Sequence, residues 1–332
     1  MGSARAADRT AADGGVPHPA ALAWSRLTGT DAAPTRVSVL KRGIKSQVYR
    51  LHGLLDGSAM IAKRRPIDAA RIERTVHEQI LPDLPVPILR WYGFLEDEDA
   101  AFGWLFTEDA GDEAATRSHD ALIARWLGTV HAAGAERARR LLPERGAAQY
   151  LAQLRAGRAR IAGHLVRAAQ PADARALLSR IIAHCDEIEA RWAEIDAACA
   201  SLPPVLVHGD VKRNNLRPWN RRGRDELLAL DWELAGWGSP VPELERLSAD
   251  RTGGAAAALA RSYLEHAGWP RIGLREMERL AWIGAVVRLA ACIDWAGMEL
   301  GGGNEGKAMR QLQYYDERLA VLLRGPGRGG AR

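Results

Sequence analysis

The chain has 332 residues, enough for two lobes, and its 47% hydrophobic and 26% charged residues are typical of a globular protein. Its formal net charge is +5, but the cations are spread along the chain and are not gathered in a Lys-rich tail. The charge pattern therefore does not favour a nucleic-acid partner, and none is expected.

The chain begins with MGSARAADRTAADGG, which lacks the apolar run of a secretory signal, so residues 1–20 are expected to form a flexible leader. The three cysteines lie far apart without a C-x-x-C pair. That usage is typical of a reduced cytoplasmic protein and argues against a disulfide scaffold or a zinc site. No run of about 18 uncharged apolar residues occurs, so no membrane span is expected.

Residues 21–110 carry mainly strand signals and one helix signal. Strand-forming residues on both sides of the polar turn 41–46 predict a hairpin. A helix is expected over 69–81, where apolar residues recur at helical spacing, and the Pro-rich LPDLPVP should end it. The strands are expected at 36–40, at 47–54, at 58–63 and from 103 into the polar connector TEDAG.

Beyond residue 111 the pattern is mostly helical. An amphipathic helix is expected over 120–133 and a second one over 176–200, where the segment SLPP ends it. Two short strand signals, VLV and LLALD, interrupt the helices. The predicted fold class is therefore α+β, with a small β-rich lobe over 21–110 and a larger, mainly helical lobe over 111–325.

Polar residues follow both of these short strands. Asp210 comes shortly after VLV, Asn215 follows five residues later, and Asp231 ends the next strand. A carboxylate fixed at the end of a strand can accept a proton from a hydroxyl, and carboxylate and amide oxygens bind divalent cations. The HGD segment alone would also fit a simple turn cap. The spacing of all three residues instead predicts a Mg²⁺ and phosphate site.

The segment HGDVKRNN, followed by LDWE, resembles the aminoglycoside phosphotransferase and choline kinase-like family, whose members are relatives of the protein kinases. That family shows H-G-D-x-x-x-x-N and then a hydrophobic strand ending in D. The resemblance implies a two-lobed protein-kinase-like fold with Asp210 as catalytic base, Asn215 as a metal ligand and Asp231 as the main metal ligand. It extends over about residues 35–320 and is sharp only over 205–244.

A kinase-type site also needs a cation to hold the phosphates of the nucleotide and a carboxylate to hold that cation. Lys63, at the end of the third predicted strand, and Glu73, on the following helix, are expected to form this pair. Glu78 is the competing partner. Glu73 is preferred because it lies at the family's usual distance from the segment LPVP.

The turn RGIKSQVYR is expected to cover the phosphates, with Gly43 offering its backbone and Ser46 its hydroxyl. The turn lacks the G-x-G-x-x-G of protein kinases, and many relatives carry Asn in place of Ser46. The segment FTEDAG resembles the family's connector between the lobes, so backbone groups near Glu108, Asp109 and Ala110 are expected to hold the nucleotide base.

Three other segments have structural interpretations. GGGNEGKA, over 301–308, resembles a P-loop, but it ends in Ala308 and follows a helical segment, so a flexible turn is predicted. His131, in LGTVHAA, is expected to be structural. Glu243, in PVPELERL, stands where relatives usually carry the Asp that braces the catalytic loop.

Two segments are expected to face the acceptor, DWELAGWGSPVPELERL and GAVVRLAACIDWAGMEL. They combine acids, aromatic rings and an arginine, which suits a neutral or anionic acceptor better than a polycation. The candidate substrate residues are Glu233, Trp237, Arg288, Asp294 and Trp295.

The sequence thus predicts a cytoplasmic enzyme, a monomer or homodimer, that uses Mg²⁺ to transfer the γ-phosphoryl of ATP or GTP to a hydroxyl of a small molecule. The expected acceptor is an antibiotic, and a nucleoside-type or other weakly charged natural product is favoured over a polycationic aminoglycoside. One alternative is a kinase of choline, homoserine or a sugar. Another is a pseudoenzyme that binds nucleotide or a partner protein without turnover, which the presence of every expected catalytic acid disfavours.

Overall fold

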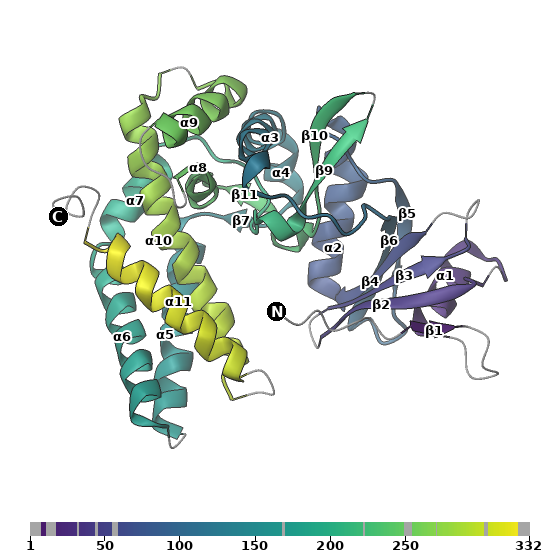
Figure 1. Ribbon diagram of the computed structural model, residues 1–332, viewed down its shortest axis with the longest axis horizontal. Helices are drawn as coiled ribbons and strands as arrows, with labels where there is room; N and C mark the ends of the chain where they lie inside the picture. The colour runs from purple at the N-terminus through teal and green to yellow at the C-terminus, as the bar shows by residue number, and fades with distance from the viewer. Residues whose placement is uncertain are drawn as a thin grey trace. The chain divides into compact units, whose positions relative to one another are not determined.

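The computed structural model describes residues 8–10, 18–31, 33–43, 46–54, 59–167, 170–221, 223–248, 254–269, 271–301 and 305–324. The chain forms two compact units (Figure 1). The first runs to Thr116 and also includes Lys212–Ala235, while the second consists of Arg117–Val211 and the residues from Gly236 onward. The first unit thus includes a segment that follows Asp210 in the chain.

The first unit is built on a six-stranded antiparallel sheet in the order β1-β2-β3-β4-β6-β5. The strand β5 has no counterpart in the sequence prediction, and most of the predicted leader (1–7 and 11–17) lies outside the described residues. The strands are β1 (Asp8–Thr10), β2 (Arg36–Arg42), β3 (Gln47–His52), β4 (Met60–Pro66), β5 (Trp91–Glu96) and β6 (Phe102–Glu108).

Helices α1 (Pro19–Thr28) and α2 (Ile67–Thr75) pack on opposite faces of this sheet. Alternate residues of a strand point to opposite faces, so Met60 and Ala62 join the apolar core beneath α1, together with Trp24. The other face of β4 carries Lys63 and Arg65 towards α2. Gly103 permits this packing, because a Cβ there would lie 2.9 Å from Cβ of Ala70 on α2.

The helix predicted over 69–81 consists of three successive pieces. After α2 the chain forms a π-helix at Val76–Ile80 and a 3₁₀ turn at Leu81–Asp83. Val76 and Ile80, at the two ends of the π-helix, are both buried. The helical run ends before LPVP, as predicted from its prolines.

The segment Lys212–Ala235 adds a hairpin to the first unit. A 3₁₀ turn at Arg213–Asn215 leads into β9 (Leu216–Arg221), which pairs antiparallel with β10 (Arg224–Ala229). The backbone N–H of Leu230 donates to the carbonyl of Asn215 over 2.8 Å. This bond closes the base of the hairpin and brings Asn215 next to the residues that precede Asp231.

The second unit is mainly helical. Figure 1 shows its long helices α5, α6, α10 and α11 side by side. A small sheet in the order β7-β11-β8 completes the unit. Its elements are α3 (Asp120–Ala133), α4 (Ala135–Leu141), β7 (Glu144–Arg145), α5 (Ala147–Arg167), α6 (Ala172–Ala190), α7 (Trp192–Ala200), β8 (Val205–Val207), β11 (Gly236–Gly238), α8 (Glu245–Ser248), α9 (Gly254–Ala267), α10 (Leu274–Glu299) and α11 (Glu305–Leu322).

These elements largely follow the sequence prediction. The helix predicted over 120–133 is α3, whereas the one predicted over 176–200 is interrupted at Arg191, between α6 and α7. Helix α10 is long and apolar enough to cross a membrane by length and composition, but 78% of its most apolar window is buried in the protein. It is therefore the core helix of this unit. The α+β class, with a β-rich first part and a helical remainder, is confirmed.

Candidate active site

A cavity of about 270 Å³ lies within the first unit, on the face of β4 that carries Lys63. Its walls combine three kinds of residue. Apolar side chains form a slot, acidic and polar residues of the connector form a rim, and charged and amide groups gather at one end. The slot is lined by Leu40, Val48, Ile61, Leu89 and Leu230, the rim by Glu108, Asp109, Ala110, Gly111 and Asp112, and the polar end by Lys63, Glu73, Asn214, Asn215 and Asp231.

Lys63 and Glu73 form the predicted ion pair. The Nζ of Lys63 lies 3.0 Å from Oε1 and 2.9 Å from Oε2 of Glu73. Glu78 takes other partners, since it accepts from Arg74 over 2.9 Å and from the indole N–H of Trp91 over 3.3 Å. One detail of the prediction is wrong, because Lys63 lies in the middle of β4 and not at its end.

Arg65 extends this pair into a cluster of five charged side chains that the sequence had not indicated. Its guanidinium contacts Glu73, Asp231 and Glu233, each at 2.8 Å, and the residue is only 1% exposed. Lys63 also contacts Oδ1 of Asp231, at 2.5 Å. We call Lys63, Arg65, Glu73, Asp231 and Glu233 the charge cluster. The available signal was strand alternation, which places residues 63 and 65 on the same face.

The charge cluster contains three carboxylates and two cations. Burial alone would raise the pKa of Asp231, but Lys63 and Arg65 hold it below its usual value. The pKa of Glu73 is likewise lowered against the effect of burial, by the same two cations. For Glu233 burial prevails over the attraction of Arg65 and raises the pKa. The cluster therefore keeps an excess of carboxylate groups that an incoming cation could neutralise.

Asn215 and Asp231 offer oxygen donors suited to Mg²⁺, which binds one or two protein oxygens and completes its shell with water and phosphate. The two described cations that contact Asp231 both bind its Oδ1, which leaves Oδ2 for a metal ion. Within the described part of the chain, no group of three or more His, Cys, Asp or Glu could hold a metal. The donor set therefore fits a Mg²⁺ that arrives with a nucleotide better than a permanently bound ion.

The turn between β2 and β3 supplies Ser46 to the same cavity. Its side chain is buried, with 5% exposure, and its Oγ has no hydrogen-bond partner among the described residues. A buried hydroxyl without a partner is costly, so it fits a ligand that brings an acceptor, such as a phosphate. Gly43 differs, because its N–H donates to the carbonyl of Ser46 over 3.1 Å. Residues 44 and 45 of this turn lie outside the described residues.

The side chains of the connector are bound to neighbouring residues. Glu108 accepts from the backbone N–H of Arg90 over 3.1 Å, and Asp109 pairs with Arg50 at 2.5 Å. Arg217 also donates to the carbonyl of Gly111 over 3.1 Å. These contacts fix the connector along the rim of the cavity.

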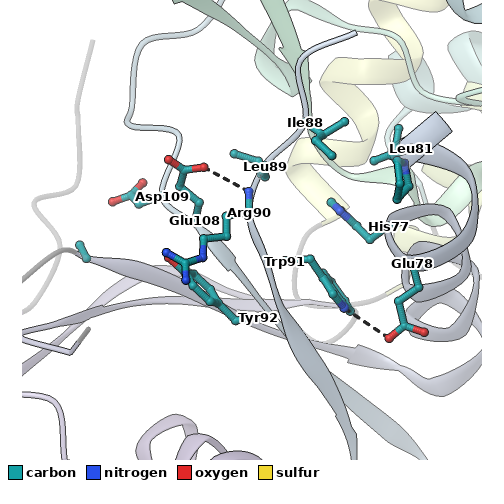
Figure 2. A pocket seen from close by; sticks show the side chains of 12 residues that line it. His77, Glu78, Leu81, Ile88, Leu89, Arg90, Trp91, Tyr92, Glu108 and Asp109 are labelled. Carbon is teal, nitrogen blue, oxygen red and sulfur yellow. Dashed lines mark hydrogen bonds between the residues drawn. The ribbon is translucent and has the colours of Figure 1, made fainter. Parts of the chain in front are cut away.

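A second cavity, of about 950 Å³, shares His77, Leu89, Glu108 and Asp109 with the first, and Figure 2 shows its lining. The ring of His77 stacks on Trp91, with 4.8 Å between centroids and 12° between planes. Burial lowers the pKa of His77 to about 4, against the attraction of Glu73. A neutral imidazole is therefore part of the lining that the two cavities share.

The segment His208–Asp210 belongs to the second unit and follows β8. Gly209 has a φ of 82°, a conformation that favours glycine. Its N–H donates to Oε1 of Glu243 over 2.7 Å, and Oε2 of Glu243 contacts Nε2 of His131 at 2.9 Å. The other ring nitrogen of His131 contacts the hydroxyl of Tyr263 at 2.8 Å. Glu243 thus reaches the loop of Asp210 despite its extra methylene, and His131 holds Glu243 and Tyr263 together, as a structural role requires.

Arg288, on α10, holds the same loop from another direction. Its guanidinium donates to the carbonyl of Gly209 over 3.1 Å and to Oδ1 of Asp210, and it lies 4.8 Å from the ring centroid of Trp295. Of the five candidate substrate residues, Arg288 therefore contacts Asp210, and Trp295 packs against Arg288. Both bonds are donated by the half-buried side chain of Arg288.

The remaining candidate residues contact other groups. Asp294 forms an ion pair with Arg160, and Trp237, on β11, lies beneath the guanidinium of Arg139. Glu233 belongs to the charge cluster. In the segment that resembles a P-loop, residues 302–304 lie outside the described residues, and Lys307 contacts Glu299 at 3.1 Å.

Comparison with known proteins places these features in a family. The model of the phosphotransferase enzyme family (APH) matches residues 36–282. Solved structures with the same fold include the spectinomycin phosphotransferase APH(9)-Ia in complex with ADP and spectinomycin, which is 11% identical with a TM-score of 0.59, over 88% of this chain and 93% of that one.

Two further similar structures are a macrolide phosphotransferase and an ethanolamine kinase. The macrolide 2'-phosphotransferase MphH of Brachybacterium faecium is 20% identical with a TM-score of 0.56, over 91% of this chain and 97% of that one. The Plasmodium vivax ethanolamine kinase is 13% identical with a TM-score of 0.59, over 92% of this chain and 88% of that one. No curated protein sequence matches the chain with significance. Because the family model spans most of the chain, the protein belongs to the phosphotransferase enzyme family, whose members phosphorylate hydroxyl groups of small molecules.

Proposed function

We propose that the protein transfers the γ-phosphoryl group of ATP or GTP to a hydroxyl of a small-molecule antibiotic, with Mg²⁺ as the cofactor. One observation carries the donor half of this proposal. A single cavity joins an apolar slot to a polar end that contains Lys63, Asn215 and Asp231. The slot suits a nucleotide base and the polar end suits its phosphates, which is the arrangement that phosphoryl transfer needs.

Each residue at the polar end has a distinct role in this proposal. Lys63, held by Glu73, neutralises the nucleotide phosphates, and Ser46 donates its hydroxyl to one of them. Asn215 and Asp231 hold Mg²⁺, which neutralises charge on the β and γ phosphates. The connector at Glu108, Asp109 and Ala110 lies along the base. Because phosphoryl transfer depends mainly on positioning and on charge neutralisation, these few groups are sufficient.

Asp210 acts on the acceptor. It accepts the proton of the attacking hydroxyl while a bond forms between the hydroxyl oxygen and the γ-phosphorus and the bond from that phosphorus to the leaving oxygen of the β-phosphate breaks. The two anchors of its loop, Glu243 and Arg288, keep the carboxylate in place. The products are the phosphorylated acceptor and the nucleoside diphosphate.

The environment of Asp210 favours a weakly charged acceptor. Arg288 binds its carboxylate, and a cationic group of an acceptor would be repelled by that guanidinium. The net charge of +5 also disfavours long-range attraction of a polycation. A nucleoside-type or similar natural product is therefore preferred to a kanamycin-like aminoglycoside.

A metabolite kinase is the second candidate, and the similarity of fold to an ethanolamine kinase favours it. Choline and ethanolamine carry a cation close to the reacting hydroxyl, however, and Arg288 disfavours such a group near Asp210. Homoserine and sugars avoid this conflict. We further propose that the protein works in the cytoplasm, as a monomer or homodimer, without a nucleic-acid or membrane partner.

A substrate panel tests the acceptor. Purified protein is incubated with γ-labelled ATP or GTP, Mg²⁺ and either weakly charged antibiotics, polycationic aminoglycosides, or choline, homoserine and sugars, with Asp210→Asn as the inactive control. The expected result is a higher kcat/KM for a weakly charged antibiotic than for any aminoglycoside. A clear preference for the polycations would contradict the proposed acceptor class, and transfer to metabolites alone would favour the second candidate.

A further inference from the structure

Arg65 is buried, whereas the residues before and after it in the sequence are not. It lies two residues after Lys63 on the same face of β4, and its side chain is buried to 1% exposure. A buried guanidinium stays ionised, so its surroundings must supply negative charge and hydrogen-bond acceptors. Here they supply three carboxylates, each 2.8 Å away.

These carboxylates come from different elements. Glu73 lies on α2, while Asp231 and Glu233 lie in and beside the short turn after β10. The planar fork of one arginine therefore ties a strand, a helix and the segment around Asp231 together. A lysine carries its three donors on one nitrogen and lacks this planar fork, so it would not span the three acids with the same geometry.

Lys63 cannot keep these elements together during the proposed reaction. It contacts both Glu73 and Asp231 in the structure, but its proposed task is to contact the phosphates. When Lys63 turns towards a nucleotide, Asp231 loses one of its two cationic partners. Arg65 still contacts Asp231, from the protein side, and it is also balanced by Glu73 and Glu233.

On the basis of the proposed function, we infer that Arg65 is a positioning residue for the metal site. Its guanidinium holds Asp231 in place next to the Lys63–Glu73 pair. Arg65 contacts Oδ1 of Asp231 and so leaves Oδ2 to Mg²⁺. Groups that hold a metal ligand from behind typically contribute 10–100-fold, as an order of magnitude, to metal affinity or activity.

The chain offers a matched control in the next residue. Arg64 is also on β4, but its side chain points to the other face, where it donates to Asp97 over 2.7 Å and lies 4.0 Å from the ring centroid of Phe102. Removing its charge changes the net charge of the protein by the same amount as removing that of Arg65. It does so without touching the charge cluster.

The experiment measures ADP binding by calorimetry at a series of Mg²⁺ concentrations, without any acceptor. In Arg65→Gln we expect the Mg²⁺ concentration that gives half-maximal ADP binding to rise about 10–100-fold, while Arg64→Gln stays at the wild-type value. Arg65→Lys keeps the buried charge but not the fork, so we expect a smaller rise in the same direction. Circular dichroism establishes that each variant is folded.

The outcomes separate this inference from the proposed function. If the wild-type protein binds ADP without any dependence on Mg²⁺, the proposed metal site and the role of Arg65 both fail. If the wild-type protein depends on Mg²⁺ and Arg65→Gln needs the same or less of it, only the role of Arg65 is overturned, because the arginine would then merely screen the carboxylates. Should Arg65→Gln not fold, Arg65→Lys decides, and a wild-type Mg²⁺ dependence in that variant overturns the inference.

Discussion

In the first unit Asp231 is held by two side-chain cations, whereas in the second unit Asp210 is held by one side-chain cation and its loop is also anchored through the backbone. Lys63 and Arg65 both bind Oδ1 of Asp231. Gly209, in contrast, is anchored at its N–H by Glu243 and at its carbonyl by Arg288. Each arrangement matches the task that we propose for the acid it holds.

A metal ligand must exchange partners when Mg²⁺ and phosphate arrive. Cationic partners allow this exchange, because one of the cations can move from the carboxylate to the incoming phosphates. A base must keep its position through the reaction, and bonds to the N–H and to the carbonyl of Gly209 fix the backbone next to Asp210, in addition to its ion pair with Arg288. The difference predicts that substitutions in the first unit act on nucleotide binding and that substitutions in the second unit act on transfer.

The largest expected effect follows from Asp231→Ala. It removes the main proposed Mg²⁺ ligand and leaves Lys63 and Arg65 with one acid fewer, so we expect Mg²⁺-dependent ADP binding and phosphoryl transfer to be lost together. Calorimetry with ADP and Mg²⁺, and a labelled-phosphate assay, measure the two. Asp225→Ala, on the exposed part of the same hairpin, is the control and should bind ADP normally. Normal Mg-ADP binding by Asp231→Ala would move the metal site elsewhere.

Asp210→Ala should separate binding from transfer. We expect kcat to fall about 10²–10⁴-fold, the usual contribution of a positioned base, while the affinity for Mg-ADP stays unchanged. Asp210→Asn is a useful companion, because it leaves an oxygen that Arg288 can bind. Transfer at close to the wild-type rate in either variant would exclude Asp210 as the base.

The contrast between the two units also explains what the sequence could reveal. The motif around Asp210, Asn215 and Asp231 was readable because its residues lie close together in the chain, at the spacing that a short loop and a hairpin impose. The pair of Lys63 and Glu73 was readable because a strand and the next helix bring residues ten positions apart to one place.

The arginines that hold Asp231 and Asp210 could not be identified from the sequence in this way. Arg65 lies 166 residues from Asp231, and Arg288 lies 78 residues from Asp210. Such contacts depend on the packing of whole elements, which local patterns do not encode. Arg288 was identified as a substrate residue and not as a partner of Asp210 for the same reason.

The pKa of His77 predicts how the stability of the protein depends on pH. Its neighbours in the first unit include Glu73, Lys63 and Glu78, and burial lowers its pKa from 6.5 to about 4. The unfolded chain therefore takes up this proton near pH 6.5, whereas the folded protein takes it up only near pH 4. The free energy of unfolding should fall as the pH drops through that window, by about 3 kcal/mol from this group.

Urea unfolding at pH 7 and pH 4.5 tests this contribution. His77→Gln cannot take up the proton, so its free energy of unfolding should fall less than that of the wild-type protein between the two values. All other titratable groups are the same in the two proteins, so their contributions to the pH dependence cancel in the difference. An equal loss in both would mean that His77 is already protonated, or exposed, in the folded state.

Glu243→Ala tests the backbone anchor in the second unit. It leaves the buried N–H of Gly209 without its acceptor, which costs about 1–3 kcal/mol, and it removes the partner of His131. We expect kcat to fall about 10-fold with unchanged Mg-ADP affinity, because the loop of Asp210 is displaced while the first unit is intact. A loss of ADP affinity with unchanged kcat would reverse the assignment of the two units.

The smallest effect is expected at Lys307, in the segment that resembles a P-loop. Its Nζ contacts Glu299 at the surface, where an ion pair contributes at most about 1 kcal/mol to stability. Lys307→Ala should therefore leave ADP affinity and kcat at wild-type values. Lys63→Ala removes a cation from the proposed phosphate site and should lower kcat about 10²–10³-fold. Both variants lose one positive charge, so their comparison isolates position from net charge. If Lys307→Ala were the damaging change, the nucleotide phosphates would lie beside the C-terminal helices, and the charge cluster of the first unit would have only a structural role.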